Sequence, residues 1–327
     1  MVGIDPADLA KAASEGFDQA TAEKVFRLLG ILREFQARSD TRDKFTLKGG
    51  TALNVFHWPI APRLSVDIDL MVTGFGNAAP GTADRTRVGR LVGTALADLG
   101  YRVVDERADA GWSFRSRYAN SLGTQDELKV DLDLLNRMTL LPAVPKSGPL
   151  LFDADDFQFP VADPAELLGQ KLTAVAYRAV ERDLFDMHLL LSSNWDRRFP
   201  RARGMYLAYS FLQDHEWARL AYPVRLEVPY DRTRLRDLLR VGSEPPTLEQ
   251  IRELAQAHLD QTARPFTSAT PEEQELRRRL LAGDREGFGA IAGETDSALA
   301  RALGEHPGLL WRLSQASRRA RPADKIA

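Results

Sequence analysis

Two short segments in which acidic and aliphatic residues alternate constrain the fold of this chain more than any other feature. Residues 65–72 read SVDIDLMV, and residues 127–135 read ELKVDLDLL. Successive side chains of a β-strand point to opposite faces of a sheet. The alternation therefore predicts two strands, each with acidic residues on one face and aliphatic residues on the other, in a sheet with one buried and one polar face.

The acidic residues of these strands form pairs at a spacing of two. Asp67 and Asp69 share a face, and Asp131 and Asp133 share a face of the second strand. Carboxylates so close on one face repel each other unless a cation lies between them. If the strands are neighbours, one acid of the second strand supplies the third carboxylate of a two-metal site. The alternative is a solvated strand with acidic outer positions.

A glycine pair precedes the first acidic strand. Gly49, Gly50 and Thr51 stand before the amphipathic segment ALNVF, which has the pattern of a helix. Glycines allow the backbone to approach a ligand closely, and the start of a helix attracts anions such as triphosphate. The segment matches neither the P-loop pattern nor GxGxxG, and a tight turn without a ligand is the alternative interpretation.

The composition limits the cofactors. With 44% hydrophobic and 28% charged residues the chain has the composition of a soluble globular protein. It has no cysteine, which excludes disulfides and thiolate metal sites. Carboxylate ligands favour Mg²⁺ or Mn²⁺. A net charge of −2 does not exclude nucleic-acid binding, because clustered Lys and Arg make phosphate contacts.

Neither a signal peptide nor an apolar run of the roughly 18 residues that span a bilayer is evident, so we expect a cytoplasmic protein with no membrane contact.

Periodicity predicts helices over 5–38 and 85–99, and strands over 101–106 and 112–118. Residues 142–164 hold five prolines and are expected to form a connector. From residue 165 onward helical periodicity dominates. The expected architecture is α+β, with N-terminal helices (1–40), a core (41–141), the connector (142–164) and a helical C-terminal domain (165–327).

One long helix is predicted over residues 171–191, KLTAVAYRAVERDLFDMHLLL. At about 100° per residue, Lys171, Arg178, Arg182 and Asp186 share one face, whereas Asp183 lies about 120° away from Lys171. We therefore expect Asp186 to be the functional carboxylate. The alternative is a solvated helix in which Arg182 and Asp186 form an i,i+4 pair.

These three segments together resemble a known family. Residues 48–70, KGGTALNVFHWPIAPRLSVDIDL, resemble the first motif of the AbiEii/AbiGii (MenT-like) toxin nucleotidyltransferases, a branch of the DNA polymerase β-like superfamily. KVDLDLLNR resembles the later Lys-x-acid strand of the family, and residues 171–191 resemble its downstream helix. The matches cover roughly residues 45–191, in the order in which the family has them.

The resemblance implies a polymerase-β-like core that transfers a nucleoside monophosphate from an NTP to RNA. The implied acceptor is the 3′ end of tRNA, the implied consequence is a block of translation and growth arrest, and the implied partner is a cognate antitoxin. Asp67, Asp69 and Asp131 would hold Mg²⁺ or Mn²⁺, with Asp133 as the weaker third ligand. The implied NTP contacts are Lys48, Gly49, Gly50, Thr51, Arg63, Ser65, and Lys171 with Arg178 or Arg182. Asp186 would orient or deprotonate the acceptor hydroxyl, or tune Lys171.

Two other functions fit the same residues. One is nucleotidylation of a protein or of a small molecule such as an aminoglycoside, because the core chemistry is identical. The other is a non-catalytic nucleotide-binding module, which the crowded carboxylates disfavour.

Four further features are given structural interpretations. His57 is expected to pack in its loop, with contact to a base or ribose as the alternative, and His188 is expected to be structural. The alternation of aromatic and basic residues over 112–118 is typical of an amphipathic strand, although RNA-binding surfaces share it. The run Arg277–Arg279 is interpreted as a charged helix face, with contact to an RNA backbone as the alternative.

Overall fold

A computed structural model describes residues 4–58, 61–74, 82–107, 111–149, 152, 156–178, 180–192, 199–214, 217, 230–262, 269–293 and 296–320. The chain divides into two compact units. Unit 1 comprises Met1–Asp163 and Asp231–Pro245, and unit 2 comprises Pro164–Tyr230 and Pro246–Ala327. The chain therefore enters unit 1 twice, and each unit is described by itself below.

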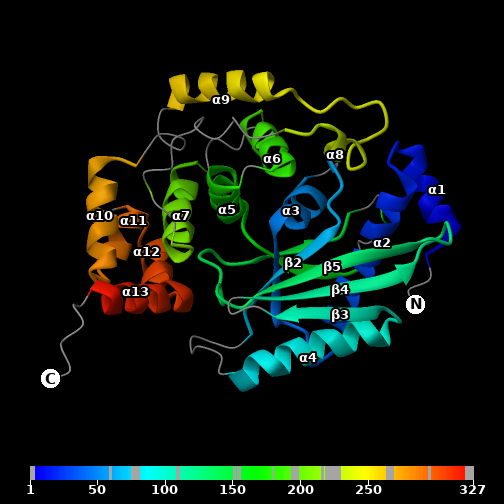
Figure 1. Ribbon diagram of the computed structural model, residues 1–327, viewed down its shortest axis with the longest axis horizontal. Coiled ribbons are helices and arrows are strands. Elements are labelled where there is room, and N and C mark those ends of the chain that lie inside the picture. Colours follow the sequence, from blue (N-terminus) through cyan, green and yellow to red (C-terminus); the bar gives the residue numbers. More distant parts are fainter. Residues whose placement is uncertain are drawn as a thin grey trace. The chain divides into compact units, whose positions relative to one another are not determined.

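Unit 1 is built on a mixed sheet that has seven strands among the described residues, in the order β3-β4-β5-β2-β1-β7-β6 (Figure 1). β2 pairs with β5 and β1 pairs with β7 in parallel, and the other neighbours are antiparallel. The strands are β1 (Phe45–Lys48), β2 (Asp67–Val72), β3 (Arg102–Arg107), β4 (Gly111–Ala119), β5 (Gln125–Asp133), β6 (Val144–Ser147) and β7 (Gln158–Val161).

The alternation in the sequence is realised as two different faces. In β5, Leu128, Val130 and Leu132 are buried, whereas Lys129 and Asp131 between them are half-buried. The apolar face is covered by helices: α4 (Thr82–Asp98) packs on β3 and β4, and α2 (Gln19–Ala37) packs on β7 and α4 (Figure 1). The acidic residues consequently lie on the opposite, partly open face.

Two N-terminal helices lie within the range 5–38 predicted from the sequence. α1 (Pro6–Ser14) is capped by Asp5, whose side chain accepts from the Ala7 N–H, and α2 is capped by Asp18. Glu23 is buried, accepts from Arg27 of the same helix at 2.7 Å, and joins α2 to the turn between β4 and β5 by accepting from the Ser121 N–H at 2.8 Å.

The expected connector is in part regular structure, and this prediction was wrong. β6 and β7 extend the sheet, with Pro145 opposite Pro160 in their antiparallel register. A proline removes one backbone donor, which an edge strand such as β6 tolerates. The sequence pattern suggested an irregular segment because prolines are rare in central strands.

The expected helical domain over 165–327 also differs from the structure, because residues 231–245 belong to unit 1. This segment contains the short helix α8 (Thr233–Arg236). Its Leu238 carbonyl accepts from the Leu64 N–H at 2.7 Å, and its Val241 N–H donates to the Gly16 carbonyl at 2.5 Å. We call residues 231–245 the return segment.

The regular elements among the described residues of unit 2 are all helices. Trp217, Met205, Phe211 and Phe288 are among its buried residues. Its helices are α5 (Pro164–Tyr177), α6 (Glu181–Leu191), α7 (Phe199–Leu212), α9 (Leu248–Thr262), α10 (Pro271–Leu281), α11 (Gly287–Ala292), α12 (Ser297–Glu305) and α13 (Pro307–Ala320). The α+β architecture predicted from the sequence is thereby confirmed.

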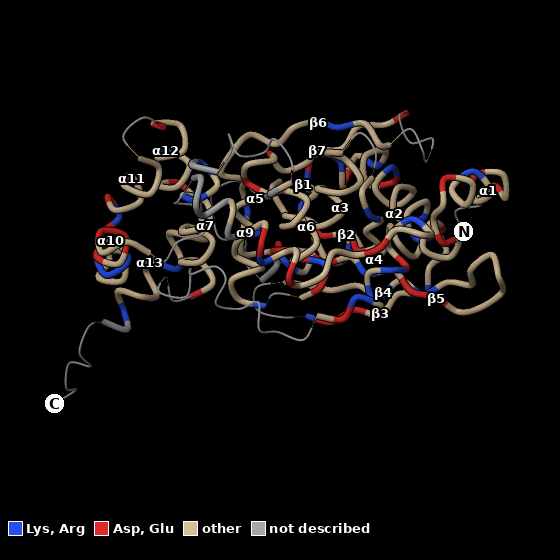
Figure 2. Tube along the Cα trace, turned by 90° about the horizontal axis from the view of Figure 1, so that it is seen from above, with Lys and Arg blue, Asp and Glu red and all other residues tan. Residues whose placement is uncertain are grey.

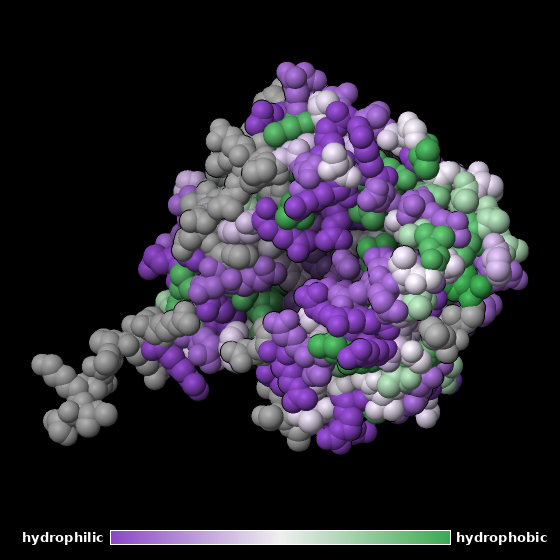
Figure 3. Space-filling model, turned by 45° about the vertical axis from the view of Figure 1, so that its right-hand side comes forward, coloured by the Kyte–Doolittle hydropathy of each residue, from purple (hydrophilic) through white to green (hydrophobic). Residues whose placement is uncertain are grey.

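None of the helices in the described ranges is both long enough and apolar enough to cross a membrane. On the face shown in Figure 3, hydrophilic residues cover most of the area and hydrophobic ones occur in small separate groups.

Candidate functional site

The glycine pair lies directly against the carboxylate motif. After β1 the chain turns at Gly49, whose φ of +72° is a conformation that favours glycine, and enters α3 (Gly49–Thr51) and the π-helix η1 (Ala52–His57). A Cβ atom on Gly49 would lie 2.1 Å from Oδ2 of Asp69. One on Gly50 would lie 2.8 Å from the Ser65 Oγ and 3.0 Å from Arg63 Nη2. Close packing therefore favours glycine at both positions, and the positive φ is a second reason for glycine at position 49 alone.

Thr51 fastens this turn to the start of β2. Its buried hydroxyl donates to the backbone carbonyl of Asp67 at 2.6 Å. The buried Asn54 side chain donates to the Gly50 carbonyl at 3.1 Å. The proton of the Thr51 hydroxyl is thus committed to the protein, and this residue positions Asp67 rather than donating to a phosphate.

Arg63 and Ser65 lie beneath the glycine pair. Both side chains are buried, and Arg63 Nη1 donates to the Leu64 carbonyl at 2.9 Å. The return segment holds the same loop through the Leu64 N–H. The structure therefore gives Arg63 a place in the support of the turn, with little surface to offer a triphosphate.

The sheet register brings the acidic strands together. β2 and β5 are parallel neighbours, with Asp69 opposite Asp131 and Asp67 opposite Lys129. Residues that face each other across neighbouring strands point to the same face. Asp67, Asp69 and Asp131 accordingly share the partly open face of the sheet, as the alternation predicts.

Asp131 and Asp133 have different surroundings. Asp131 accepts from the Ser113 hydroxyl at 2.5 Å and from Lys129 Nζ at 2.6 Å, and remains partly exposed. Asp133 forms an ion pair with Lys48, accepts from the Asn136 side chain at 2.6 Å and accepts from the Leu135 N–H at 2.9 Å.

The electrostatics of Asp133 follow from these contacts. Burial raises the pKa of the Asp133 carboxyl, but the Lys48 charge and the donors from Asn136 outweigh burial and hold the pKa below its usual value. Both oxygens of Asp133 are engaged in structure. Asp131 is therefore the better placed of the two as a third carboxylate, and Lys48 is committed to Asp133.

The donor chemistry of this face fits a hard divalent cation. Carboxylate oxygens are the ligands that Mg²⁺ and Mn²⁺ prefer, and Asp67 and Asp69 present them side by side. Within the described residues, however, no group of three or more His, Cys, Asp or Glu side chains is arranged to hold a metal ion. Asp131 also accepts a hydrogen bond from Lys129, whose ammonium would compete with a metal ion for this carboxylate.

A second group of charged residues lies in unit 2. The predicted continuous helix over 171–191 is in fact two helices, α5 and α6, separated after Tyr177. Lys171 Nζ lies 2.6 Å from Asp186 and 3.3 Å from Asp183. The prediction that Asp183 lies away from Lys171 was therefore wrong, because counting 100° per residue fails across a break in the helix. The choice of Asp186 as the functional carboxylate stays a prediction.

The Asp183 carboxylate forms ion pairs with two cationic side chains. It accepts from Lys171 and, in a bidentate contact, from Arg178 Nε at 2.6 Å and Nη2 at 3.0 Å. Burial raises the pKa of the Asp183 carboxyl, but Lys171 and Arg178 outweigh it and lower the pKa below its usual value. The Asp183 side chain is 1% exposed and the Arg178 side chain is 63% exposed. Asp183 thus fixes an arginine that faces solvent.

Asp186 and Arg182 complete the predicted set. Asp186 is fully buried and paired with Lys171, an arrangement that suits tuning of Lys171 better than proton abstraction from a substrate. Arg182 is half-buried on α6.

The structure agrees with the structural roles expected for the histidines, the aromatic residues of β4 and the arginines of α10. His57 Nε2 hydrogen-bonds the Ala162 carbonyl at 2.9 Å, which fits the packing role. Trp112, Phe114 and Tyr118 are buried, so β4 is an ordinary amphipathic strand whose aromatic rings are not available for stacking on bases. Burial lowers the pKa of His188. In α10, Arg278 and Arg279 pair with Glu275 and Asp284, as in a charged helix face.

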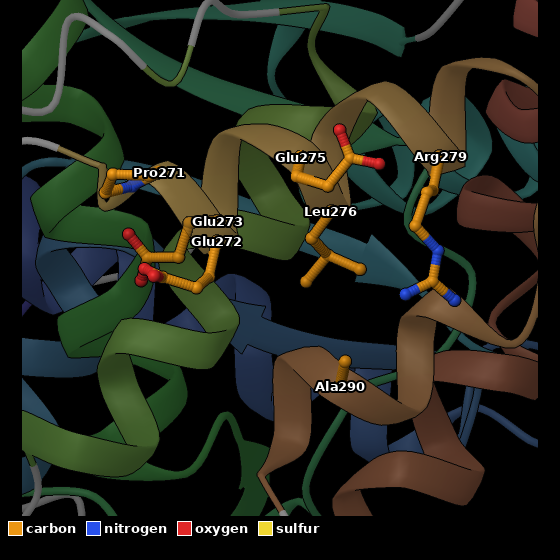
Figure 4. Close-up of a pocket in the computed structure, with 7 residues that line it drawn as sticks. All are labelled: Pro271, Glu272, Glu273, Glu275, Leu276, Arg279 and Ala290. Atoms are coloured by element: carbon orange, nitrogen blue, oxygen red, sulfur yellow. The ribbon is translucent and has the colours of Figure 1, made fainter.

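Unit 2 also contains a shallow pocket of about 560 Å³ between α10 and α11. Leu276 points toward Ala290 across it, and Glu272 and Glu273 line one end (Figure 4). Glu273 pairs with Arg203 and Arg279 pairs with Asp284. Its charged groups thus include structural ion pairs, and the pocket has no arrangement that suggests chemistry.

Sequence reasoning missed two site residues, Asp183 and Lys129, and one pairing, that of Lys48 with Asp133. Asp183 was set aside for the reason given above. Lys129 was quoted only as part of a motif, and the pairing of Lys48 with Asp133 joins positions 85 residues apart, which no local pattern reveals. The one available signal for Lys129 was its place on the acidic face, two residues before Asp131.

A glycine turn packed on an Asp-x-Asp strand, with a third carboxylate in register beside it, defines a candidate nucleotidyl-transfer centre. Comparison with known proteins agrees with this class. Residues 30–315 match the model of the nucleotidyl transferase AbiEii toxin family of type IV toxin–antitoxin systems, and the chain belongs to this family. It is a nucleotidyltransferase toxin of such a system.

A comparison with solved structures gives MenT4, a nucleotidyltransferase toxin from Mycobacterium tuberculosis H37Rv. The identity is 20%, the TM-score is 0.48, and the match covers 98% of this chain and 100% of that one. A comparison with curated proteins found no match.

Proposed function

We propose that this toxin transfers a nucleoside monophosphate from an NTP to the 3′ end of tRNA and so blocks translation in the cytoplasm. The observation that carries the proposal is the contact of Asp69 with Gly49 on one side and its register with Asp131 on the other. This arrangement places carboxylates beside a backbone turn that excludes side chains, as binding of a metal-bound triphosphate requires.

Asp67 and Asp69 would hold Mg²⁺ or Mn²⁺, with Asp131 as the third ligand. The ion supplies charge neutralisation for the phosphates. In the transfer, the acceptor hydroxyl oxygen forms a bond to the α-phosphorus, the bond from that phosphorus to pyrophosphate breaks, and the hydroxyl proton passes to solvent. The chain itself contributes position: Thr51 fixes the Asp67 backbone, and the glycine turn fixes Asp69.

The test is incubation of purified protein with tRNA, total cell protein and each labelled NTP in turn, with Mg²⁺ and with a chelator. We expect label at tRNA 3′ ends, lost with the chelator and with Asp67→Asn, and sequencing of the ends identifies the added nucleotide. Labelling of a protein or a small molecule, with unextended tRNA under every NTP, contradicts the tRNA proposal and leaves the nucleotidyltransferase class intact.

Lys171 is proposed to act on the triphosphate, with Asp183 and Asp186 holding its ammonium in place. Lys171→Ala is then expected to raise the KM for NTP more than it weakens tRNA binding. The two are titrated separately. A large loss of tRNA affinity with an unchanged NTP dependence would move Lys171 to the acceptor.

A further inference from the structure

A row of basic side chains continues the carboxylate face across the sheet. In the register, Lys129 is opposite Arg115, Glu127 is opposite Arg117, and Arg117 is opposite Arg102 of β3. Since partners in register share a face, and Lys129 is also opposite Asp67, these cations lie on the same face as the carboxylates. Figure 2 shows Lys and Arg on β4 and its neighbours, together with acidic residues.

These side chains reach solvent. Arg115 and Arg117 are 50% and 51% exposed, Lys129 is 41% exposed, and Arg102 is also exposed. Neighbouring strands are about 4.8 Å apart, and residues two apart along a strand are separated by about 7 Å. The basic group thus begins one strand away from Asp67 and extends along β4.

One carboxylate holds both arginines. Arg115 Nη1 and Arg117 Nε each donate to Glu127 at 3.1 Å. Exposed ion pairs of this kind contribute about 0 to 1 kcal/mol each and weaken with salt. A polyanion can therefore replace Glu127 as the acceptor at little cost in stability.

We infer that this face, formed by Arg102, Arg115, Arg117 and Lys129, binds the phosphate backbone of the acceptor RNA beside the carboxylates. Guanidinium groups bind phosphate in a bidentate manner, and the place of the face beside the carboxylates favours the acceptor RNA as the source of that phosphate. The aromatic side chains of β4 point into the core, so contact is with the backbone and not with the bases. The inference rests on the proposed function, because it takes RNA to be the acceptor.

The experiment compares two double variants of the full chain. Arg115→Gln with Arg117→Gln removes two cations of the face. The matched control is Arg278→Gln with Arg279→Gln on α10, where two exposed arginines pair with Glu275 and Asp284. Fluorescence anisotropy with labelled tRNA gives the affinity at several salt concentrations, a fluorescent NTP analogue gives nucleotide affinity, and the thermal midpoint reports folding.

The β4 variant should bind tRNA at least about ten-fold more weakly, since each charge-assisted hydrogen bond to a phosphate is strong. The slope of its affinity against salt, both on logarithmic scales, should be shallower by about 0.7 to 0.9 for each phosphate that the variant no longer neutralises. NTP affinity and the thermal midpoint should stay unchanged, and the α10 control should bind tRNA as the wild type does. Glu127→Gln should bind tRNA more tightly, because it releases both arginines.

Two results would overturn the inference: unchanged tRNA affinity and salt dependence in the β4 variant, or an equal loss in the α10 control. Loss of binding to an acidic protein partner with tRNA binding intact would assign the face to protein recognition instead. Failure of the proposed function gives a different result, because in that case the wild-type protein itself transfers no label to RNA.

Discussion

Replacement of Gly49 by alanine separates the two reasons for glycine at that position. The φ of +72° costs an alanine about 1–2 kcal/mol. The added Cβ, 2.1 Å from Asp69 Oδ2, also forces the Asp69 side chain from its rotamer, which costs a further ~0.5–1.5 kcal/mol. We expect Gly49→Ala to lose roughly 1.5–3.5 kcal/mol of stability, as the sum of these two terms.

The matched control is Gly123→Ala in the turn between β4 and β5. Gly123 has a φ of +78°, and an added Cβ would meet no atom within 4 Å. Gly123→Ala should therefore introduce the same kind of backbone strain as Gly49→Ala, but it should displace no carboxylate. Gly50→Ala is the complementary case, with contacts to Ser65 and Arg63 and no positive φ.

The assay is single-turnover transfer of labelled nucleotide, measured beside the thermal midpoint. A displacement of about 1 Å in a reacting group can lower a rate about 100-fold. Gly49→Ala should therefore lose about two orders of magnitude in transfer, whereas Gly123→Ala should transfer at the wild-type rate with a moderately lowered midpoint. Equal transfer by the two alanine variants would refute the claim that the glycine turn positions Asp69.

Three further predictions concern single charges. Asp67→Asn should abolish transfer with a thermal midpoint equal to or above that of the wild type, because it relieves repulsion on the strand; unfolding of this variant would make the residue structural. Lys48→Met leaves the partly buried Asp133 carboxylate without its cation and should cost about 1–3 kcal/mol in denaturant unfolding, and retention of wild-type stability would show that the pair is not needed. The lowered pKa of Asp183 adds stability above about pH 3.9, the ordinary value, and that stability is lost as the pH falls through the folded-state value. Asp183→Asn should therefore flatten the acid limb of a plot of unfolding free energy against pH, and an unchanged limb would contradict the lowered pKa.

The local part of the site was predictable from sequence. Alternation alone placed Asp67, Asp69 and Asp131 on polar faces, because a strand has a period of two whatever surrounds it. The sequence did not predict that β2 pairs with β5. The prediction of a shared site assumed this pairing, because contacts between distant segments set the register of strands. The expected metal ligands, NTP contacts and acceptor came from the family resemblance.

Other features lay beyond sequence reasoning for physical reasons. The break after Tyr177 has no proline or glycine to mark it, so helical periodicity was extended through it. Whether Asp131 or Asp133 is free to act as the third carboxylate depended on which of them forms an ion pair with the Lys48 side chain. Both outcomes are decided by tertiary packing, which overrides local propensity.

The return segment has a consequence for the order in which a cell can make this protein active. A ribosome completes β7 long before it reaches Leu238, whose carbonyl secures the loop ahead of the Asp-x-Asp strand. A nascent chain that ends before residue 238 therefore lacks one of the fastenings of its carboxylate loop. We expect fragments that stop in this interval to be harmless to the cell, so that most of the polypeptide is made before the cell is exposed to the completed toxin.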